Sequence, residues 1–487
     1  MTSKAAEAAV IGPVVVHPED VQAGKAGTSP PSYEEVMGYF KTSVNNSEPE
    51  LPPLVYIDIM PRCLSVGNMV GGTAPTFQNF SDILAGANLW LGSNPGLSVW
   101  KCETVERKVD KGPCIDLESM LQHESAYGFN VHVLGLRMWL TKKLDPSAPV
   151  QQLRMMNVVP EEYKVPVNLY SHWRYQSFFV PGVGKYPMGL GNFISYVGIK
   201  ETLAKLNETL KNDPLPGSVL NVDSTTIKFA ENFQTGPIDP EVTCWHEKGG
   251  SAAKRYTQIL RIFYICGPPK QELIQMHEVE PDVLVMPEWN KPARFANFDN
   301  VLTKARLWLQ CQQGIRLVNI ETRKARVHSV QNSLKIDSDS TDQFYSAYMD
   351  ARFVHVLRLF YVSAPEIGTY SGTVLTSRLF VPVRLTMKTF ETMSQTMSRI
   401  VAWLQLTGLN IFGVETVPYL FVDNDGNGVN SDRADFKVNR QSGKYWVTTI
   451  RLYFSTSFQE PSPLLLPRTT DWMTQGGGRA SGMCTIT

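Results

Sequence analysis

The chain has 487 residues, of which 43% are hydrophobic and 19% are charged, as is typical of a folded globular protein. Its 46 basic and 46 acidic residues cancel, so we expect no basic surface for nucleic acid. The seven cysteines are scattered and include no CxxC pair, which predicts reduced thiols in a cytoplasmic protein. The sequence contains no secretory leader and no apolar run of about 18 residues, so we expect no spanning helix.

The first segment, residues 1–50, is rich in alanine, serine and proline and is expected to be a disordered tail. Within it, Pro30, Pro31, Ser32 and Tyr33 form a PPSY sequence that resembles the PPxY ligand of WW domains. The prolines favour a polyproline II backbone, which an aromatic groove recognises at little entropic cost. The resemblance implies a WW-domain partner, such as a ubiquitin ligase. The budding motifs of viral matrix proteins have the same pattern.

After this tail, one pattern occurs four times. Each copy has an apolar run ending in proline, an amphipathic helical stripe, a glycine stop, a middle strand, a long loop and an aromatic-rich last strand. We therefore predict an α+β fold of four β-α-β-β units with mixed or antiparallel sheets. The predicted divisions are units at 51–145, 146–275 (divergent), 276–370 and 371–465, and a flexible C-terminal tail at 466–487.

Each unit also carries an acid followed by a hydroxyl residue on its middle strand, and an arginine on its last strand. A catalytic acid is seldom needed four times in one chain, whereas a fold-defining contact is needed once per unit. We therefore predict structural cross-strand pairs, in which the carboxylate accepts the guanidinium fork and the hydroxyl bonds a neighbouring backbone group. The four pairs are Glu103 with Arg137, Asp223 with Arg261, Glu321 with Arg358, and Glu415 with Arg451.

The loop before the last strand of the fourth unit contains Asp423, Asp425 and Asn427, which match positions 1, 3 and 5 of an EF-hand loop. Ala434 stands where that loop needs a bidentate glutamate, so the segment is either a weak calcium loop or a polar turn between strands. No histidine has metal-ligand spacing and no nucleophile elbow is present, so we predict no catalytic residue and no cofactor.

At the C-terminus, Cys484 begins a CTIT sequence that fits the prenylation pattern C-a-a-X. Thr487 is not one of the usual last residues, and a single prenyl chain with little basic charge nearby binds membranes only marginally. The segment is therefore either an unmodified tail or a prenylated one that gives peripheral membrane contact.

The leading functional interpretation is a non-enzymatic scaffold or binding protein that recruits a WW-domain partner through PPSY. Its binding surface would be the long loops, roughly at 105–130, 226–255, 323–352 and 418–445. One alternative is a viral or virus-derived structural protein, matrix-like or capsid-like, that forms homo-oligomers and uses PPSY for budding. Another is an enzyme whose site lies between units.

Overall fold

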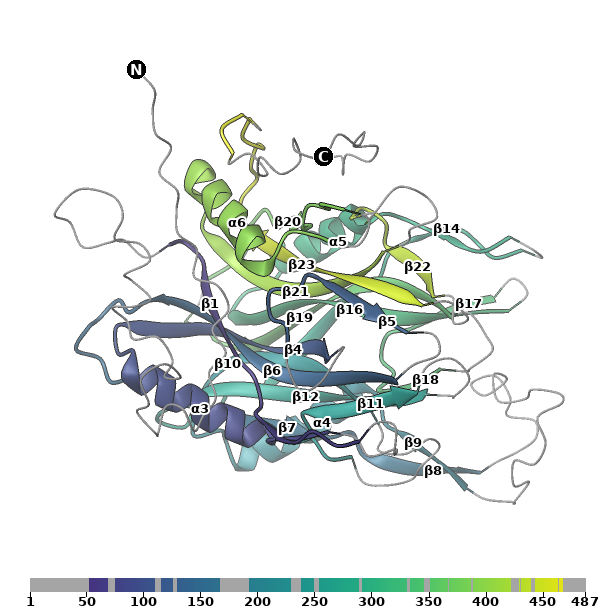
Figure 1. Cartoon of the computed structure of the whole chain (residues 1–487), viewed down its shortest axis with the longest axis horizontal. Helices are drawn as coiled ribbons and strands as arrows, with labels where there is room; N and C mark the ends of the chain where they lie inside the picture. Colours follow the sequence, from purple (N-terminus) through teal and green to yellow (C-terminus); the bar gives the residue numbers. More distant parts are fainter. Residues whose placement is uncertain are drawn as a thin grey trace.

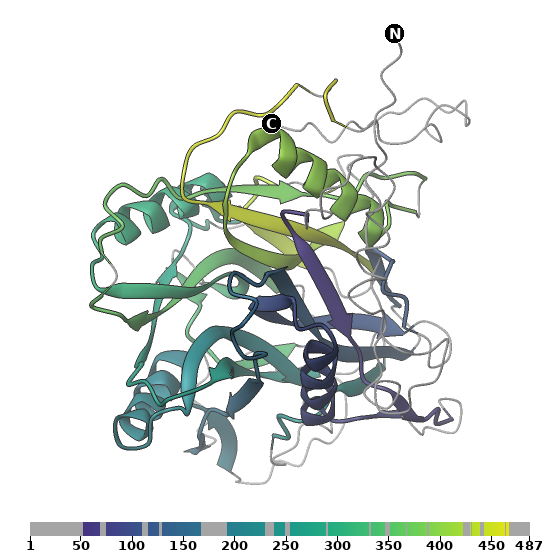
Figure 2. The same cartoon turned by 90° about the vertical axis from the view of Figure 1, so that its left-hand side faces the viewer.

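The structure is a computed structural model of the chain, and Figures 1 and 2 show it in two views. It describes residues 52–68, 75–109, 115–125, 129–166, 192–228, 238–248, 254–288, 291–330, 333–345, 351–366, 368–386, 389–421, 429, 431–438, 443–462 and 464–466. Of these residues, 50% lie in strands and 17% lie in four helices.

The elements of the described residues fall into four units in chain order. Unit 1 contains β1 (Val55–Ile59), β2 (Cys63–Ser65), β3 (Thr76–Phe77), α3 (Phe80–Ser93), β4 (Leu97–Val109), β5 (Leu121–Glu124) and β6 (Phe129–Lys142). Unit 2 contains β7 (Leu153–Val158), β8 (Glu162–Pro166), β9 (Asn192–Tyr196), α4 (Ile199–Asn212), β10 (Gly217–Lys228), β11 (Cys244–Lys248) and β12 (Lys254–Cys266). Unit 3 contains β13 (Ile274–Val279), β14 (Val283–Val285), β15 (Arg294–Phe295), α5 (Phe298–Gln310), β16 (Ile315–Val330), β17 (Ser333–Asp337), β18 (Asp342–Tyr345) and β19 (Ala351–Ser363). Unit 4 contains β20 (Thr376–Phe380), α6 (Met393–Thr407), β21 (Ile411–Phe421), β22 (Asp435–Val438) and β23 (Lys444–Phe454).

The expectation of an α+β fold is wrong, because the chain is mostly β and forms a four-blade, propeller-like arrangement. The predicted four-fold repetition itself is confirmed. Each blade is an antiparallel sheet with a long inner strand, a long middle strand and an outer edge. The inner strands are β4, β10, β16 and β21, and the middle strands are β6, β12, β19 and β23.

The outer edge of every blade is made of two short strands that pair end to end with one middle strand. In unit 1, β1 pairs with one half of β6, and β11 from unit 2 pairs with the other half. The same exchange occurs around the ring: unit 3 gives β18 to β12, unit 4 gives β22 to β19, and unit 1 gives β5 to β23. Because β5 links unit 1 to unit 4, the exchange of strands closes into a circle.

This exchange explains why the α+β expectation failed. The four long segments were expected to be loops that form a binding surface, but each contains one of the short strands β5, β11, β18 and β22, which complete the neighbouring blade. The structure places this part of each loop in a sheet, so it is not a free segment.

The four helices lie around the outside, near the corners of the molecule in Figure 2. Three begin at side-chain caps, which satisfy backbone N–H groups at the first turn: Asn79 for α3, Asn297 for α5 and Thr392 for α6. Gly408 ends α6 in the left-handed conformation, with φ of 64°. These caps fix where each apolar stripe begins.

Each helix packs between its own blade and the next one. The core around α3 includes Phe263 of unit 2, the core around α4 includes Phe360 of unit 3, and the core around α5 includes Tyr453 of unit 4. The core around α6 includes Trp139 of unit 1. Burial of these side chains stabilises the joint between consecutive units, so the helices and the exchanged strands both hold the ring closed.

Candidate functional site

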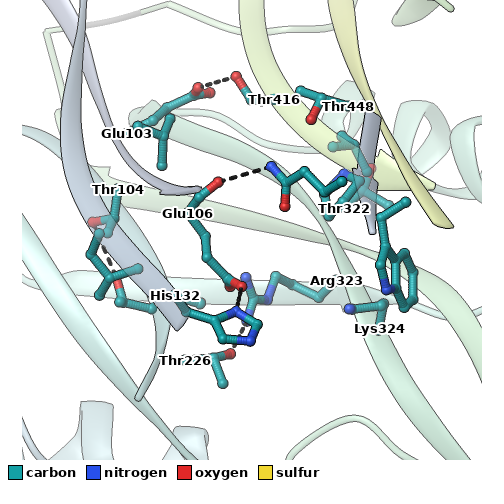
Figure 3. A pocket seen from close by; sticks show the side chains of 18 of the residues that line it. Glu103, Thr104, Glu106, His132, Thr226, Thr322, Arg323, Lys324, Thr416 and Thr448 are labelled. Atoms are coloured by element: carbon teal, nitrogen blue, oxygen red, sulfur yellow. Dashed lines mark hydrogen bonds and ion pairs between the residues drawn. The ribbon is translucent and has the colours of Figure 1, made fainter. Parts of the chain in front are cut away.

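The four inner strands surround the axis of the ring in the order β4, β10, β16 and β21, with β21 next to β4. Between them lies a central cavity of about 320 Å³, lined by residues from all four units (Figure 3). This volume is at the lower end of the range for sites that bind small molecules. Its lining includes the repeated acids of the inner strands and residues further along the same strands.

On one side of the cavity, the repeated acids and hydroxyl residues form a closed circuit, here called the acid–hydroxyl ring. Each acid accepts hydrogen bonds from the hydroxyl residue of the preceding unit, and Glu103 of unit 1 accepts one from Thr416 of unit 4. The bonds are Thr104 N to Asp223 Oδ2 (2.8 Å), Ser224 N to Glu321 Oε2 (3.2 Å), Thr322 Oγ1 to Glu415 Oε1 (2.6 Å) and Thr416 Oγ1 to Glu103 Oε2 (2.8 Å). The repeated pair therefore joins consecutive units.

Each arginine lies directly opposite the acid of its own unit in the strand register. In units 1 to 3 the guanidinium nevertheless bonds the outer strand, contrary to the predicted geometry: Arg137 binds Asp58 through two bonds of 2.6 Å. The equivalent outer-strand residues are Asn157 for Arg261, Glu278 for Arg358 and Leu379 for Arg451. The distances from arginine nitrogen to the opposite acid are 3.8 Å for Arg358 and 3.7 Å for Arg451.

The arginines also reach the preceding unit. Arg137 donates to Thr416 Oγ1 (3.0 Å), Arg261 to Thr104 Oγ1 (3.0 Å) and Arg358 to Ser224 Oγ (2.7 Å). In unit 4 the pattern changes: Arg451 bonds the Tyr419 hydroxyl, and its guanidinium lies 3.7 Å from the centre of the Phe298 ring. The predicted bond from the hydroxyl to a backbone group is thus replaced by side-chain contacts between units.

Burial has a direct electrostatic effect on this ring. It raises the pKa values of Glu103 and Glu321, although Lys101 and Arg323, respectively, act in the opposite direction. Behind the ring, burial opposes the charge of Arg137, but Asp58 more than compensates and the pKa of Arg137 is raised. A buried charge without a partner is costly, so these contacts hold the ring together.

Lys101 crosses the axis on this side of the cavity. Its ammonium group donates to Asn319 Oδ1 (2.6 Å) and to the Val414 carbonyl, which links unit 1 to units 3 and 4. Asn319 in turn donates to the Val222 carbonyl (2.7 Å), and Asn221 accepts from the backbone of Cys102 (3.2 Å). Polar side chains from three units thus fill the axis beside the acid–hydroxyl ring.

Three residues beyond each acid, the units stop resembling one another. This position, called the wall position here, is Glu106, Thr226, Lys324 or Pro418, and all four residues line the cavity. Figure 3 shows Glu106, Thr226 and Lys324 around the same space. The sequence did not single them out as site residues, because the repeat pattern draws attention only to residues that the copies share.

At the wall, Glu106 forms a 2.6 Å contact between Oε1 and Nδ1 of His132 (Figure 3). Burial acts to raise the pKa of Glu106, but the hydrogen bond and charge of His132 prevail and the pKa is lowered. The His132 ring stacks on Trp245 with a 5.4 Å separation, and Trp245 comes from the exchanged strand β11. An exchanged strand therefore builds part of the cavity.

A second exchanged strand contributes Glu124. It pairs with Lys108 (2.8 Å) and Lys444 (3.3 Å) and accepts a bond from Trp446 Nε1 (3.0 Å). Burial opposes the charge of Glu124, but the two lysines hold its pKa well below its ordinary value. This cluster ties β5 of unit 1 to β23 of unit 4.

The described residues offer no metal centre, because no group of three or more His, Cys, Asp or Glu side chains among them is placed to hold an ion. His355 is buried, and desolvation lowers its pKa to about 3, so it stays neutral at physiological pH. Within the same described ranges, no helix has both the length and the apolar character needed to span a membrane.

Several predicted site residues lie outside the described residues. They are the PPSY sequence at Pro30, Pro31, Ser32 and Tyr33, the candidate prenylation site Cys484, and the candidate calcium loop at Asp423, Asp425 and Asn427.

Comparisons with protein-family models, curated proteins and solved structures gave no significant match. The function is therefore inferred from the ring and its cavity.

Proposed function

We propose that this protein is a non-enzymatic binding scaffold, a closed ring of four units that recruits a WW-domain protein through Pro30–Tyr33. The observation that carries the scaffold role is the circular exchange of β5, β11, β18 and β22. An arrangement closed in this way resists separation of its units, so it holds attached segments in a fixed relation.

The repeated acids support the same proposal. All four are committed to hydrogen bonds between units, and the arginines opposite them are buried. A catalytic acid needs access to substrate and a proton that it can transfer. The repeated motif is therefore better explained as the closure of the ring than as a catalytic set.

The WW-domain part of the proposal is tested with the full chain and its Tyr33→Ala variant. We expect the native chain to bind at least one member of a WW-domain panel, ubiquitin ligases included, and the variant to lose binding by roughly tenfold or more. Titration of each immobilised WW domain measures this. If no domain in the panel binds the native chain, the WW partner is ruled out, although the ring remains.

A matched control is Tyr163→Ala, because Tyr163 is an exposed tyrosine on β8 and lies outside the PPSY sequence.

The rival function, a viral or virus-derived structural protein, predicts self-assembly into sheets or particles. Sedimentation and electron microscopy at high protein concentration distinguish it from a scaffold that remains a discrete ring.

A second candidate function, an enzyme with a site between units, is favoured by the position of the His132–Glu106 pair in the inter-unit cavity. A metabolite that is consumed in the presence of the protein, and is not consumed by a His132→Gln variant, would support it. Binding without turnover supports the scaffold instead.

The cytoplasmic location and the Cys484 modification belong to the same proposal. The intact mass of protein from its native cell tests the prenylation hypothesis. Loss of the last three residues with addition of an isoprenoid places the scaffold at a membrane surface, whereas an unmodified C-terminus removes that attachment.

A further inference from the structure

The central cavity has an uneven distribution of charge partners. Each carboxylate that lines it accepts at least one hydrogen bond from a described residue. Besides the four acids of the acid–hydroxyl ring, Glu106 has His132, Glu124 has Trp446 with two lysines, and Glu247 has the Tyr256 hydroxyl. Every carboxylate in the cavity thus already accepts a hydrogen bond, from a charged group or from a neutral donor such as the Tyr256 hydroxyl.

Two positively charged side chains that line the cavity, those of Arg323 and Lys324, have no such charged partner in the described part of the chain. Among the described residues, neither Arg323 nor Lys324 has an acidic group within ion-pair distance. Arg323 donates only one bond to a described side chain, from Nη2 to Thr226 Oγ1 at 3.3 Å, and its buried Nε has no partner.

Arg107, Arg399 and Arg451 also have buried nitrogens that bond no described residue. Among these four arginines, however, only Arg107 and Arg323 line the cavity, and Arg107 has Asp58 within 3.7 Å. An acceptor bound at Arg323 would satisfy its free donor.

Lys324 is in an equally unusual setting. Its side chain is exposed to the water-accessible space of the cavity, while the protein around it desolvates the ammonium group and lowers its pKa. The ammonium group lies over the Trp446 ring, whose centre is 4.5 Å away. Glu106 and Glu124 act on it electrostatically from a longer distance.

The two cations approach the cavity from different sides. Successive residues of a strand point to opposite faces, so Arg323 faces Thr226 of unit 2 while Lys324 faces Trp446 of unit 4. Figure 3 shows both side chains in one view of the cavity. Trp245, which is 8% exposed, adds an indole Nε1 that has no hydrogen-bond acceptor among the described residues.

We propose that the central cavity binds a small organic anion, whose carboxylate or phosphate group lies between Arg323 and Lys324. Those two groups supply charge, and the indole of Trp245 supplies a further donor. The Trp446 ring offers an apolar surface to the body of the ligand. This proposal does not depend on the WW-domain contact proposed for the PPSY segment.

Calorimetric titration of the full chain tests the proposal, with benzoate, succinate and inorganic phosphate as probes. Benzamide serves as the uncharged control for benzoate, because it has the same ring and nearly the same shape. A titration with sodium chloride at the same ionic strength is the control for salt effects. We expect benzoate to bind and benzamide to bind at least tenfold more weakly; the other two probes distinguish a carboxylate site from a phosphate site.

Variants locate the anion. Lys324→Met should weaken binding of the preferred anion roughly tenfold or more, while Lys324→Arg should retain most of it. Arg323→Gln should also weaken binding, because it removes the positive charge. The glutamine amide still offers a hydrogen-bond donor, so the loss reports on the charge. Lys205→Met is the matched control: Lys205 is an exposed lysine of α4 that pairs with Glu161 and Glu201 and does not line the cavity.

The proposal is overturned if none of the three anions binds, if benzamide binds as well as benzoate, or if Lys324→Met binds as tightly as the native chain. Near-ultraviolet circular dichroism and the thermal midpoint establish that each variant is folded. If Lys324→Met does not fold, Arg323→Gln and Lys324→Arg still decide between a charge-specific site and none.

Discussion

The four inner strands carry two sets of residues, the acid–hydroxyl ring and the wall position, and the comparison between them separates structural residues from candidate functional ones. At the acid–hydroxyl ring, the units repeat an acid and a hydroxyl residue, and each acid accepts a hydrogen bond from the backbone N–H or the hydroxyl group of the residue in the preceding unit. Three residues further along, the wall position is Glu106, Thr226, Lys324 and Pro418, and these side chains line a cavity. A contact that closes a ring must recur in every unit, whereas a ligand site needs each side chain only once.

The largest effect should come from breaking the contact between Asp58 of β1 and Arg137, which supports the acid–hydroxyl ring from behind. Asp58→Ala leaves the fully buried Arg137 without its carboxylate, and we expect the free energy of unfolding to fall by about 3–5 kcal/mol. Urea unfolding at pH 7 measures it. The double variant Asp58→Leu/Arg137→Met should recover part of the loss, because it removes the unpaired Arg137, while the buried Arg107 still loses its 3.7 Å contact with Asp58. A loss below about 1 kcal/mol for the single variant would contradict a structural role.

An intermediate effect should come from the exchanged strand β5. Glu124→Gln weakens the contacts to Lys108 and Lys444, and we expect a loss of about 1–3 kcal/mol at pH 7. Because the pKa of Glu124 is lowered in the folded chain, its contribution is present above the ordinary value of 4.5 and is lost as the pH falls below it. The stability difference between native chain and variant should therefore shrink in acid, and a constant difference would argue against the ion pairs.

The smallest effect should come from the wall position. Lys324→Met loses the contact with the Trp446 ring but also removes a desolvated charge, so we expect stability to change by no more than about 0.5 kcal/mol. A lysine whose pKa is lowered by folding opposes folding below its ordinary value of 10.5, and this opposition disappears above it. Any advantage of the variant should therefore diminish at high pH. A loss comparable to that of Asp58→Ala would make Lys324 a structural residue.

The repeated part of the molecule could be predicted from the sequence because the copies share residue types. An acid, a hydroxyl residue and an arginine occur at corresponding places, and this recurrence alone is enough to indicate four units. The partners of the arginines could not be predicted in this way. The outer-strand position is Asp58, Asn157, Glu278 or Leu379, so its residue type differs in every unit.

The blades and the cavity were missed for related physical reasons. The strands β5, β11, β18 and β22 have only four or five residues each, and their partners lie in another unit, so local hydrophobic periodicity does not reveal them. Arg323 and Lys324 are adjacent basic residues that in a sequence suggest a solvated face. The available signal was the break in the repeat at the wall position, where otherwise similar units acquire different side chains.

The exchange of strands also limits how this chain can vary in length. In an open array of repeats, one repeat can be added or removed and its neighbours still pack. Here, removal of any unit would leave one blade without its short strand and one donor strand without its acceptor. Such a strand would pair with another molecule, as exposed sheet edges do. A lineage carrying this fold can therefore diversify the side chains inside the ring far more easily than it can change the number of units around it.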